Sequence, residues 1–231
     1  MSVSGMIYCI SDLHGCYDEF IALLEKIKFS PRDTLYILGD AIDRGKNPIG
    51  CVNFIMKEKN IHFIMGNHEQ MMMEFYEYND FAGMWLYNGG KATMNQFKKL
   101  AKTGRDKIFA FLRNRSYYKT VEVNGKKYFL SHAGLDADVP FERQEQDALI
   151  WGREEFYRHK ALEEYTCIFG HTPTRFIRNS DDCSVWFDEN HNDKICIDCG
   201  CVYGGMLAAL RLNDGEIFYV NSHAKNIRSA S

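Results

Sequence analysis

Six side chains with the chemistry of metal ligands stand just after short apolar runs of the sequence. They are Asp12, His14, Asp40, Asn67, His132 and His171. Carboxylate, amide and imidazole groups are donors that hold divalent transition metals in proteins. Six donors suit two ions better than one, and a carboxylate in the middle of the set can bridge them. Asp40 is central in the order and is the expected bridge.

Each of these residues, taken singly, has an ordinary structural explanation. A lone aspartate before a helix is usually an N-cap, and a lone buried histidine is usually a hydrogen-bonded core residue. The six together are less easily explained in this way, because they fall just past expected strands and beside glycines, where the backbone can approach closely. We therefore predict a dinuclear metal centre.

The first seventy residues predict the elements that would bring these side chains together. Apolar runs at 8–10, 35–38 and 61–65 each end in polar residues and lead into a helical segment. Asn47 and Pro48 predict the N-cap and first residue of the second helix. Right-handed crossovers in this βαβα order place the strands parallel, with their polar ends at one edge of the sheet.

The remainder of the chain predicts a helical excursion followed by a second set of strands. Residues 67 to about 115 are expected to be helical, with a turn at 88–90. Further strands are expected at 118–123, 127–131, 167–169, 184–187, 194–198, 207–212 and 216–220. No linker or repeat divides the chain, so we predict one α/β domain over residues 1–231, with two mixed sheets packed as a sandwich and helices outside.

The composition excludes several classes of protein. With 45% hydrophobic and 26% charged residues, the chain of 231 residues is globular and not disordered. A net charge of −3 without a basic block gives no general attraction for nucleic acid. The apolar runs are too short to span a membrane, and the N-terminus lacks the features of a secretory signal. We expect a cytoplasmic protein whose eight cysteines are mostly buried thiols, and whose anionic ligands are attracted locally.

Five motifs resemble those of the metallophosphatases related to protein serine/threonine phosphatases, a family that includes small bacterial and phage enzymes and the symmetrical dinucleoside tetraphosphatases. Residues 11–15 read SDLHG, similar to the G-D-x-H-G motif with serine for the first glycine. Residues 39–45 read GDAIDRG and match G-D-x-x-D-R-G, and the three other motifs are GNHE at 66–69, HAG at 132–134 and GH at 170–171. The resemblance implies the αββα fold of that family.

The resemblance also implies a role for each site residue. Asp12, His14 and Asp40 would hold one metal, and Asp40 with Asn67, His132 and His171 would hold the other, with manganese expected first and iron or zinc as alternatives. A hydroxide bridging the ions would attack phosphorus in line. Residues matching the family's other functional positions are Arg44 and Arg153 for binding phosphate, His68 as the general acid, and Asp43 as the carboxylate that orients it. Arg153 has an ordinary alternative as a surface arginine near two glutamates.

Two substrate classes and one non-enzymatic reading remain open at this point. A phosphatase acting on phosphoproteins or small phosphate esters is the first hypothesis, because the chain is short and lacks obvious extra elements for two nucleosides. A dinucleoside tetraphosphate hydrolase is the alternative, favoured by the apolar Met65 before GNHE, whereas Glu69 favours the phosphatase. A non-catalytic binding protein on the same scaffold could dispense with His68 or Asp43, yet both are present.

The cysteines carry a weaker signal. Cys196, Cys199 and Cys201, with Cys183 upstream, are spaced as a zinc cluster might be, but the segment alternates like a buried strand. Cys16 follows the first motif and is expected to be a small apolar filler and not a reactive thiol. The stretch 85–93 is expected either to form a wall for the substrate or to turn one helix into the next.

Overall fold

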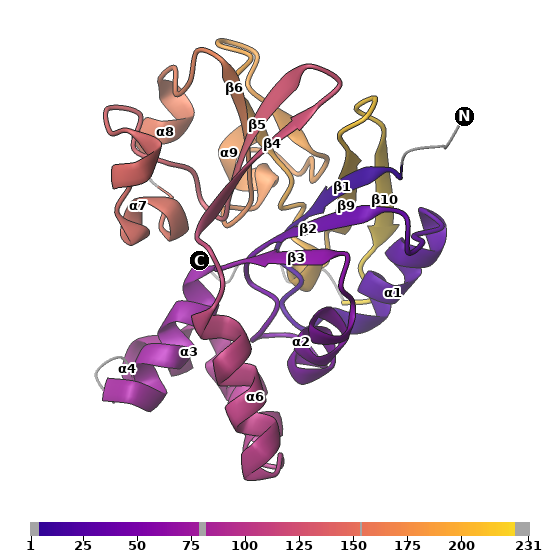
Figure 1. Cartoon of the computed structure of the whole chain (residues 1–231), viewed down its shortest axis with the longest axis vertical. Helices are drawn as coiled ribbons and strands as arrows, with labels where there is room; N and C mark the ends of the chain where they lie inside the picture. Colours follow the sequence, from indigo (N-terminus) through magenta and orange to yellow (C-terminus); the bar gives the residue numbers. More distant parts are fainter. Residues whose placement is uncertain (1–4, 79–81, 153, 225–231) are drawn as a thin grey trace.

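The computed structural model describes residues 5–78, 82–152 and 154–224 and contains two five-stranded β-sheets (Figure 1). The first sheet has the strand order β10-β9-β1-β2-β3. Its strands are β1 (Ile7–Ile10), β2 (Thr34–Leu38), β3 (Ile61–Ile64), β9 (Met206–Arg211) and β10 (Ile217–Asn221). β1, β2 and β3 are parallel, as predicted, and β9 is antiparallel to both β1 and β10.

The second sheet has the order β4-β5-β6-β8-β7. Its strands are β4 (Tyr118–Val123), β5 (Lys126–Ser131), β6 (Tyr165–Phe169), β7 (Trp186–Phe187) and β8 (Lys194–Cys196). β5, β6 and β8 are parallel, whereas the hairpin partner β4 and the edge strand β7 are antiparallel. Both sheets are therefore mixed, as expected.

Helices cover the outer face of each sheet. α1 (Tyr17–Lys26) and α2 (Pro48–Lys57) make the crossovers of the first sheet, and Asn47 caps α2 by accepting the Gly50 N–H. The predicted excursion consists of α3 (Asn67–Tyr78), α4 (Ala82–Trp85), a turn at Leu86–Gly90, α5 (Lys91–Phe97) and α6 (Lys102–Arg113). The second sheet is accompanied by α7 (Gln146–Ile150), α8 (Glu154–Arg158) and α9 (Thr174–Arg178).

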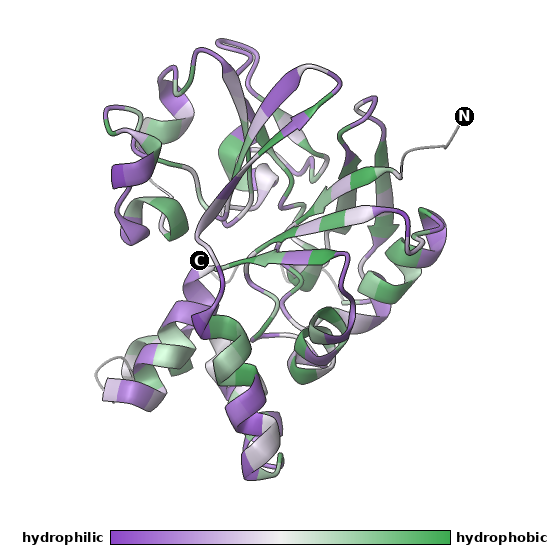
Figure 2. Ribbon diagram, in the orientation of Figure 1, coloured by the Kyte–Doolittle hydropathy of each residue, from purple (hydrophilic) through white to green (hydrophobic). Residues whose placement is uncertain are grey.

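The alternation of side chains along the strands produces three apolar layers. In β1, Tyr8 and Ile10 pack with the helices, whereas Cys9 packs between the two sheets together with Leu130 and Ile168 of the second sheet. A third cluster packs the second sheet against α7 and α8. Because strands of the first sheet are buried on both faces, they are apolar along most of their length (Figure 2). The layers are helix, sheet, sheet and helix, as the resemblance implied.

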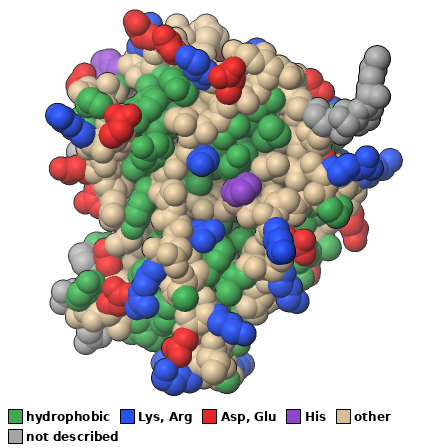
Figure 3. Space-filling view, viewed as in Figure 1, with side chains coloured by type: hydrophobic (Ala, Val, Ile, Leu, Met, Phe, Trp, Pro, Cys, Tyr) green, Lys and Arg blue, Asp and Glu red, His purple; other side chains and the backbone are tan. Residues whose placement is uncertain are grey.

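Charged side chains are interspersed on the surface. On the face drawn in Figure 3, single lysine and arginine side chains are scattered over the centre and lower part, most acidic side chains lie nearer the margins, and no continuous basic block is seen. None of the helices in the described part of the chain has the length and apolar character needed to cross a bilayer.

Candidate metal centre

The predicted ligands meet where parallel strands of both sheets end. Asp12 and His14 follow β1, Asp40 follows β2, and Asn67 begins α3 after β3. From the second sheet, His132 follows β5 and His171 follows β6. The carboxyl ends of parallel strands share one edge, which explains why residues up to 159 positions apart become neighbours.

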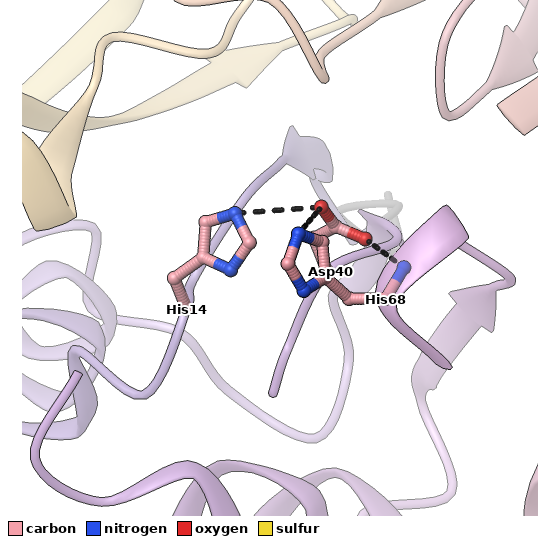
Figure 4. Close-up of side chains that lie close together, drawn as sticks. All are labelled: His14, Asp40 and His68. Carbon is pink, nitrogen blue, oxygen red and sulfur yellow. Dashed lines mark hydrogen bonds and ion pairs between the residues drawn. The ribbon is translucent and has the colours of Figure 1, made fainter. Parts of the chain in front are cut away.

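The carboxylate of Asp40 lies at the centre of this group. Its Oδ2 atom is 3.4 Å from His14 Nε2, 3.5 Å from His132 Nε2 and 3.8 Å from His68 Nε2. Figure 4 shows the rings of His14 and His68 approaching the same oxygen of this carboxylate, while the other oxygen accepts the His68 N–H. This oxygen of Asp40, Oδ2, faces one expected ligand of each ion, His14 and His132, which is the arrangement that a bridging ligand requires.

Asn67, His132 and His171, the expected ligands of the second ion besides Asp40, also lie close together. His132 Nε2 lies 2.9 Å from Asn67 Oδ1 and 3.2 Å from His171 Nδ1. The other ring nitrogen of His132 contacts the Leu38 carbonyl at 2.8 Å, and that of His14 contacts the Ile42 carbonyl at 2.9 Å. A carbonyl accepts Nδ1–H in each case, so both Nε2 atoms keep the lone pair that a metal needs.

The backbone adopts an unfavourable conformation at these loops. Positive φ angles occur at Asp12 (50°), His14 (41°), Asp40 (53°) and His171 (70°). Left-handed backbone costs a residue with a Cβ about 1–2 kcal/mol. Such strain persists only where the surrounding structure fixes it, and it is concentrated here at the proposed ligands.

Glu69 holds the loop that carries Asp40. Its buried carboxylate accepts the N–H groups of Asp40 and Ala41 at 2.9 Å, and those of Ile42 and Gly66 at 3.2 Å. Four donors on one carboxylate are enough to fix the turn despite its positive φ. From the sequence, Glu69 was a motif residue and a marker of the phosphatase class, and its hydrogen bonds to this loop were not predicted.

The buried acids at the centre fit cations. Burial raises the pKa of Asp12 to about 7, and raises the pKa of Asp40 well above its usual range with help from the charges of Glu69 and Asp12. Asp12 Oδ2 accepts the Ser11 hydroxyl and the His171 N–H, but the buried Oδ1 has no hydrogen-bond partner. Burial also lowers the pKa of His132 to about 4, so that its ring is neutral. Neutral imidazoles and a free carboxylate oxygen suit divalent ions.

Arg44 lies at the mouth of the centre. Its Nη1 donates to His14 Nε2, its Nε donates to the Asn88 carbonyl at 3.3 Å, and its guanidinium lies 5.4 Å from the Tyr203 ring centroid. Because His14 Nε2 is also an expected metal ligand, a cation there requires the guanidinium to shift. The planar group would then face the centre as a donor for an anion.

His68 and Asp43 form a buried pair beside Asp40. His68 Nδ1 is 2.6 Å from Asp43 Oδ2, and that oxygen also accepts Trp85 Nε1–H at 2.8 Å. Asp43 Oδ1 accepts the Thr93 hydroxyl at 2.5 Å, while Thr93 Oγ1 accepts the Asp43 N–H at 2.8 Å. Burial raises the pKa of Asp43 to about 7, and the two hydrogen bonds oppose this rise.

Residues 85–93 turn one helix into the next at Leu86–Gly90, which was one of the two expectations for this segment. Trp85 is fully buried and presents no surface to a substrate, whereas Tyr87 is 92% exposed. Trp85 and Thr93 orient the carboxylate of Asp43.

Comparison with known proteins agrees with this architecture. The sequence pattern of the family described as calcineurin-like phosphoesterases matches residues 5–205. The chain belongs to this family. Phosphoesterases of this family use divalent metal ions, and the clustered carboxylates, amide and imidazoles provide candidate ligands for them.

Relatives of this phosphoesterase are named either as protein phosphatases or as dinucleoside tetraphosphatases. Serine/threonine-protein phosphatase 1 of Salmonella typhimurium is 26% identical, over 89% of this chain and 91% of that protein. An asymmetrical bis(5'-nucleosyl)-tetraphosphatase of Bacillus velezensis is 28% identical, over 92% of this chain and 91% of that protein. A crystal structure of a candidate diadenosine tetraphosphatase has a similar fold, with a TM-score of 0.72 and 20% identity over 97% of this chain and 96% of that one.

One further acid of the phosphoesterase escaped the sequence analysis. Asp198 follows β8 and is 5% exposed, and burial together with the charge of Asp12 raises its pKa well above the usual range. The signal was available, because Asp198 also comes just after an apolar run. Arg153, the second expected phosphate ligand, lies outside the described residues.

Proposed function

We propose that this phosphoesterase hydrolyses phosphomonoesters of serine and threonine in proteins. Asp12, His14 and Asp40 would hold one divalent ion, and Asp40, Asn67, His132 and His171 would hold the other. When bound, two such ions activate water and stabilise charge on the attacking and leaving oxygens. Manganese is the metal that the family resemblance favours, and iron and zinc remain alternatives, because the oxygen donors suit manganese whereas the imidazoles suit iron and zinc.

The chain's own residues supply substrate binding and the proton. Arg44 would grip two phosphoryl oxygens through its planar guanidinium. His68 would donate a proton from Nε2 to the leaving oxygen, and Asp43 would accept Nδ1–H and favour the protonated ring. Burial and the charge of Arg44 lower the pKa of His68 well below its usual value, so the ring needs the negative charges of Asp43 and of a bound phosphate to hold the proton that it donates.

The observation that carries the substrate class is a cavity beside the metal centre. Its volume is about 700 Å³, and its lining includes Ala133, next to His132, and Trp151. The Trp151 ring packs edge-on against His171, with centroids 5.8 Å apart. The predicted metal ligands are not among its lining residues, so a substrate whose phosphate lies at the metals would reach this cavity past Ala133 and Trp151.

The charge of the cavity favours a peptide. Its inner wall is apolar, with Leu135 and Phe156 among the lining residues. Four carboxylates face two cationic side chains around the rest of the cavity: Asp136, Asp138, Glu145 and Asp147 against Arg143 and Lys160. A dinucleoside tetraphosphate would bring several further phosphate charges toward these acids, at a Coulombic cost, whereas basic residues beside a phosphoserine would be attracted.

The alternative is hydrolysis of a dinucleoside tetraphosphate, which the names of several relatives favour. The buried His68–Asp43 pair argues against the third reading, a non-catalytic binding protein, because binding alone needs no such proton donor. The pair also matters more for an alkoxide than for a phosphate leaving group, since an alkoxide is the stronger base.

One comparison of rates tests the proposal. With manganese held constant, kcat/KM is measured for a phosphoserine peptide with neighbouring arginines, for the same peptide with neighbouring glutamates, and for diadenosine tetraphosphate. We expect the basic phosphopeptide to be the best substrate, and Asp136→Asn combined with Asp138→Asn to narrow its advantage over the acidic peptide. A higher kcat/KM for diadenosine tetraphosphate than for either peptide would overturn the assignment.

A further inference from the structure

Two groups of potential metal ligands lie apart from the proposed catalytic centre within the described residues. The first consists of Asp188, His191 and Asp193. It already contains a cation, because the buried Lys194 Nζ lies 2.8 Å from Asp188 Oδ2 and 2.6 Å from Asp193 Oδ1. This group is an internal salt bridge and needs no metal.

The second group contains two thiols and a carboxylate with no comparable cation. The ligand atoms of Cys16, Glu19 and Cys201 all lie within 4.8 Å of one another. The three residues are 8%, 6% and 2% exposed. Among the described residues, Glu19 has no lysine or arginine partner, and its one ion-pair contact is His223, whose Nδ1 lies 3.5 Å from Glu19 Oε1.

The four residues come from segments that are far apart in the sequence. Cys16 is the N-cap residue of α1 and Glu19 lies in its first turn. Cys201 begins a short 3₁₀ turn after β8, and His223 follows β10. The His223 N–H donates to Glu19 Oε1 at 2.9 Å, which holds this last segment against α1.

We propose that Cys16, Glu19, Cys201 and His223 bind one structural zinc ion, separate from the two catalytic metals. Two sulfurs, one oxygen and one nitrogen complete a tetrahedral zinc site. In such a site the two sulfurs are about 3.8 Å apart, and the oxygen and nitrogen about 3.3 Å apart, from the usual zinc–ligand bond lengths. The 3.5 Å between His223 Nδ1 and Glu19 Oε1 is close to the second value, and the atoms of Cys16, Glu19 and Cys201 lie within 4.8 Å of one another.

The donor set selects zinc over the expected catalytic metal. Thiolates bind zinc strongly and manganese weakly, whereas the catalytic ligands contain no sulfur. A zinc ion can reach this group through a cavity of about 260 Å³, which is lined by Cys16, Glu19 and His223 and extends to Arg44. The zinc would therefore connect Cys16 at the start of α1, two residues beyond His14, to the segments that precede β9 and follow β10.

This assignment also explains why the cysteine-rich segment 196–201 forms no zinc site of its own. Cys196 packs in the core of the second sheet, Cys199 packs between the sheets, and Cys201 packs with the helices of the first sheet. The three thiols thus point into different layers. Cys16 packs in the hydrophobic core, as expected of a small apolar filler, and its thiol also lies near that of Cys201.

Cobalt gives a direct test on the whole chain, because thiolate ligands produce an intense near-ultraviolet charge-transfer band and the catalytic ligands include no thiolate. We expect the metal-free protein titrated with Co²⁺ under reducing conditions to develop this band, saturating at one ion per chain. Cys16→Ser and Cys201→Ser should each remove most of the band. The matched control Cys183→Ser should keep it, because Cys183 is partly exposed and outside the group.

A milder variant keeps the test valid if the buried cysteine variants fail to fold. His223→Gln alters a side chain that is 63% exposed, and it should weaken Co²⁺ affinity at the thiolate site at least tenfold. Zinc analysis should give three ions per wild-type chain and two per Cys201→Ser chain. The proposal is overturned if Co²⁺ fills only sites without a thiolate band, if Cys201→Ser keeps the band, or if Cys16 and Cys201 are recovered as a disulfide without zinc.

Discussion

Replacement of His68 by asparagine tests the proposed proton donor most directly. The imidazole is 1% exposed, and its Nδ1 is held at 2.6 Å by an Asp43 that Trp85 and Thr93 fix in turn. Loss of a general acid typically slows the chemical step by about 100- to 10,000-fold. Because this donor is so firmly held, we expect a loss of at least about 1,000-fold in kcat for phosphoserine peptides, or about 4 kcal/mol of activation free energy.

The size of this loss should depend on the leaving group. A serine alkoxide needs a proton as it departs, a phenol with a pKa of about 10 needs it less, and a nitrophenolate needs it least. We therefore expect His68→Asn to slow phosphoserine, phosphotyrosine and p-nitrophenyl phosphate hydrolysis in decreasing order. The assay is kcat for the three substrates at one pH and one manganese concentration.

Two controls separate proton donation from other effects. His62→Asn alters an exposed histidine on β3 that stacks on Tyr36 with ring centroids 5.2 Å apart, and it should leave all three rates near wild type. Metal analysis of His68→Asn should still show two ions at the catalytic centre. An equal loss for the three leaving groups, or loss of a metal ion, would refute the role given to His68.

Four other changes probe the centre and its supports. Asp40→Asn should lower occupancy at both catalytic positions, and a chelator should abolish turnover of the wild type; metal analysis showing full activity with one ion would contradict a dinuclear site. Arg44→Ala should raise KM, lower kcat and weaken inhibition by inorganic phosphate at unchanged metal content. Thr93→Val removes the hydroxyl that donates to Asp43, at a local cost of about 1.5–3 kcal/mol. It should slow phosphoserine hydrolysis more than nitrophenyl phosphate hydrolysis, and equal slowing would show that Thr93 has only a structural role. Glu69→Gln places an NH₂ group against backbone N–H donors. It should lower the free energy of unfolding, measured in urea, by about 2–5 kcal/mol. An unchanged urea midpoint of unfolding would contradict the role given to the Glu69 carboxylate.

The sequence predicted that the polar side chains after the parallel strands meet at one edge, because its signal is local. Each strand of the parallel set is an apolar run that ends in a ligand, so strand and ligand are visible in the same few residues. The positions of Asp12, Asp40 and Asn67 follow from this pattern and from the handedness of the crossovers. His132 and His171 belong to the second sheet and join these residues only because the two sheets pack together. The family resemblance implied this packing, but no local sequence pattern predicts it.

The supporting residues could not be predicted because their partners are distant. Glu69 acts on backbone N–H groups up to 29 positions away, and Thr93 acts on a carboxylate 50 positions away. Both depend on where a loop lies relative to a helix, which side-chain types alone do not specify. Met65, weighed in the sequence as a marker of substrate class, is 2% exposed and packs in the core, so it presents no surface to a substrate.

The left-handed residues at the strand ends have a consequence for protein engineering. Asp43 and Arg44, with φ angles of 70° and 61°, share this conformation with four of the proposed ligands. Glycine would relieve the strain at any of these positions, and so would asparagine to a lesser degree. Selection for thermal stability alone would therefore enrich substitutions that stabilise the fold and destroy the centre. Directed evolution of this enzyme should hold these six codons fixed and search for stability elsewhere.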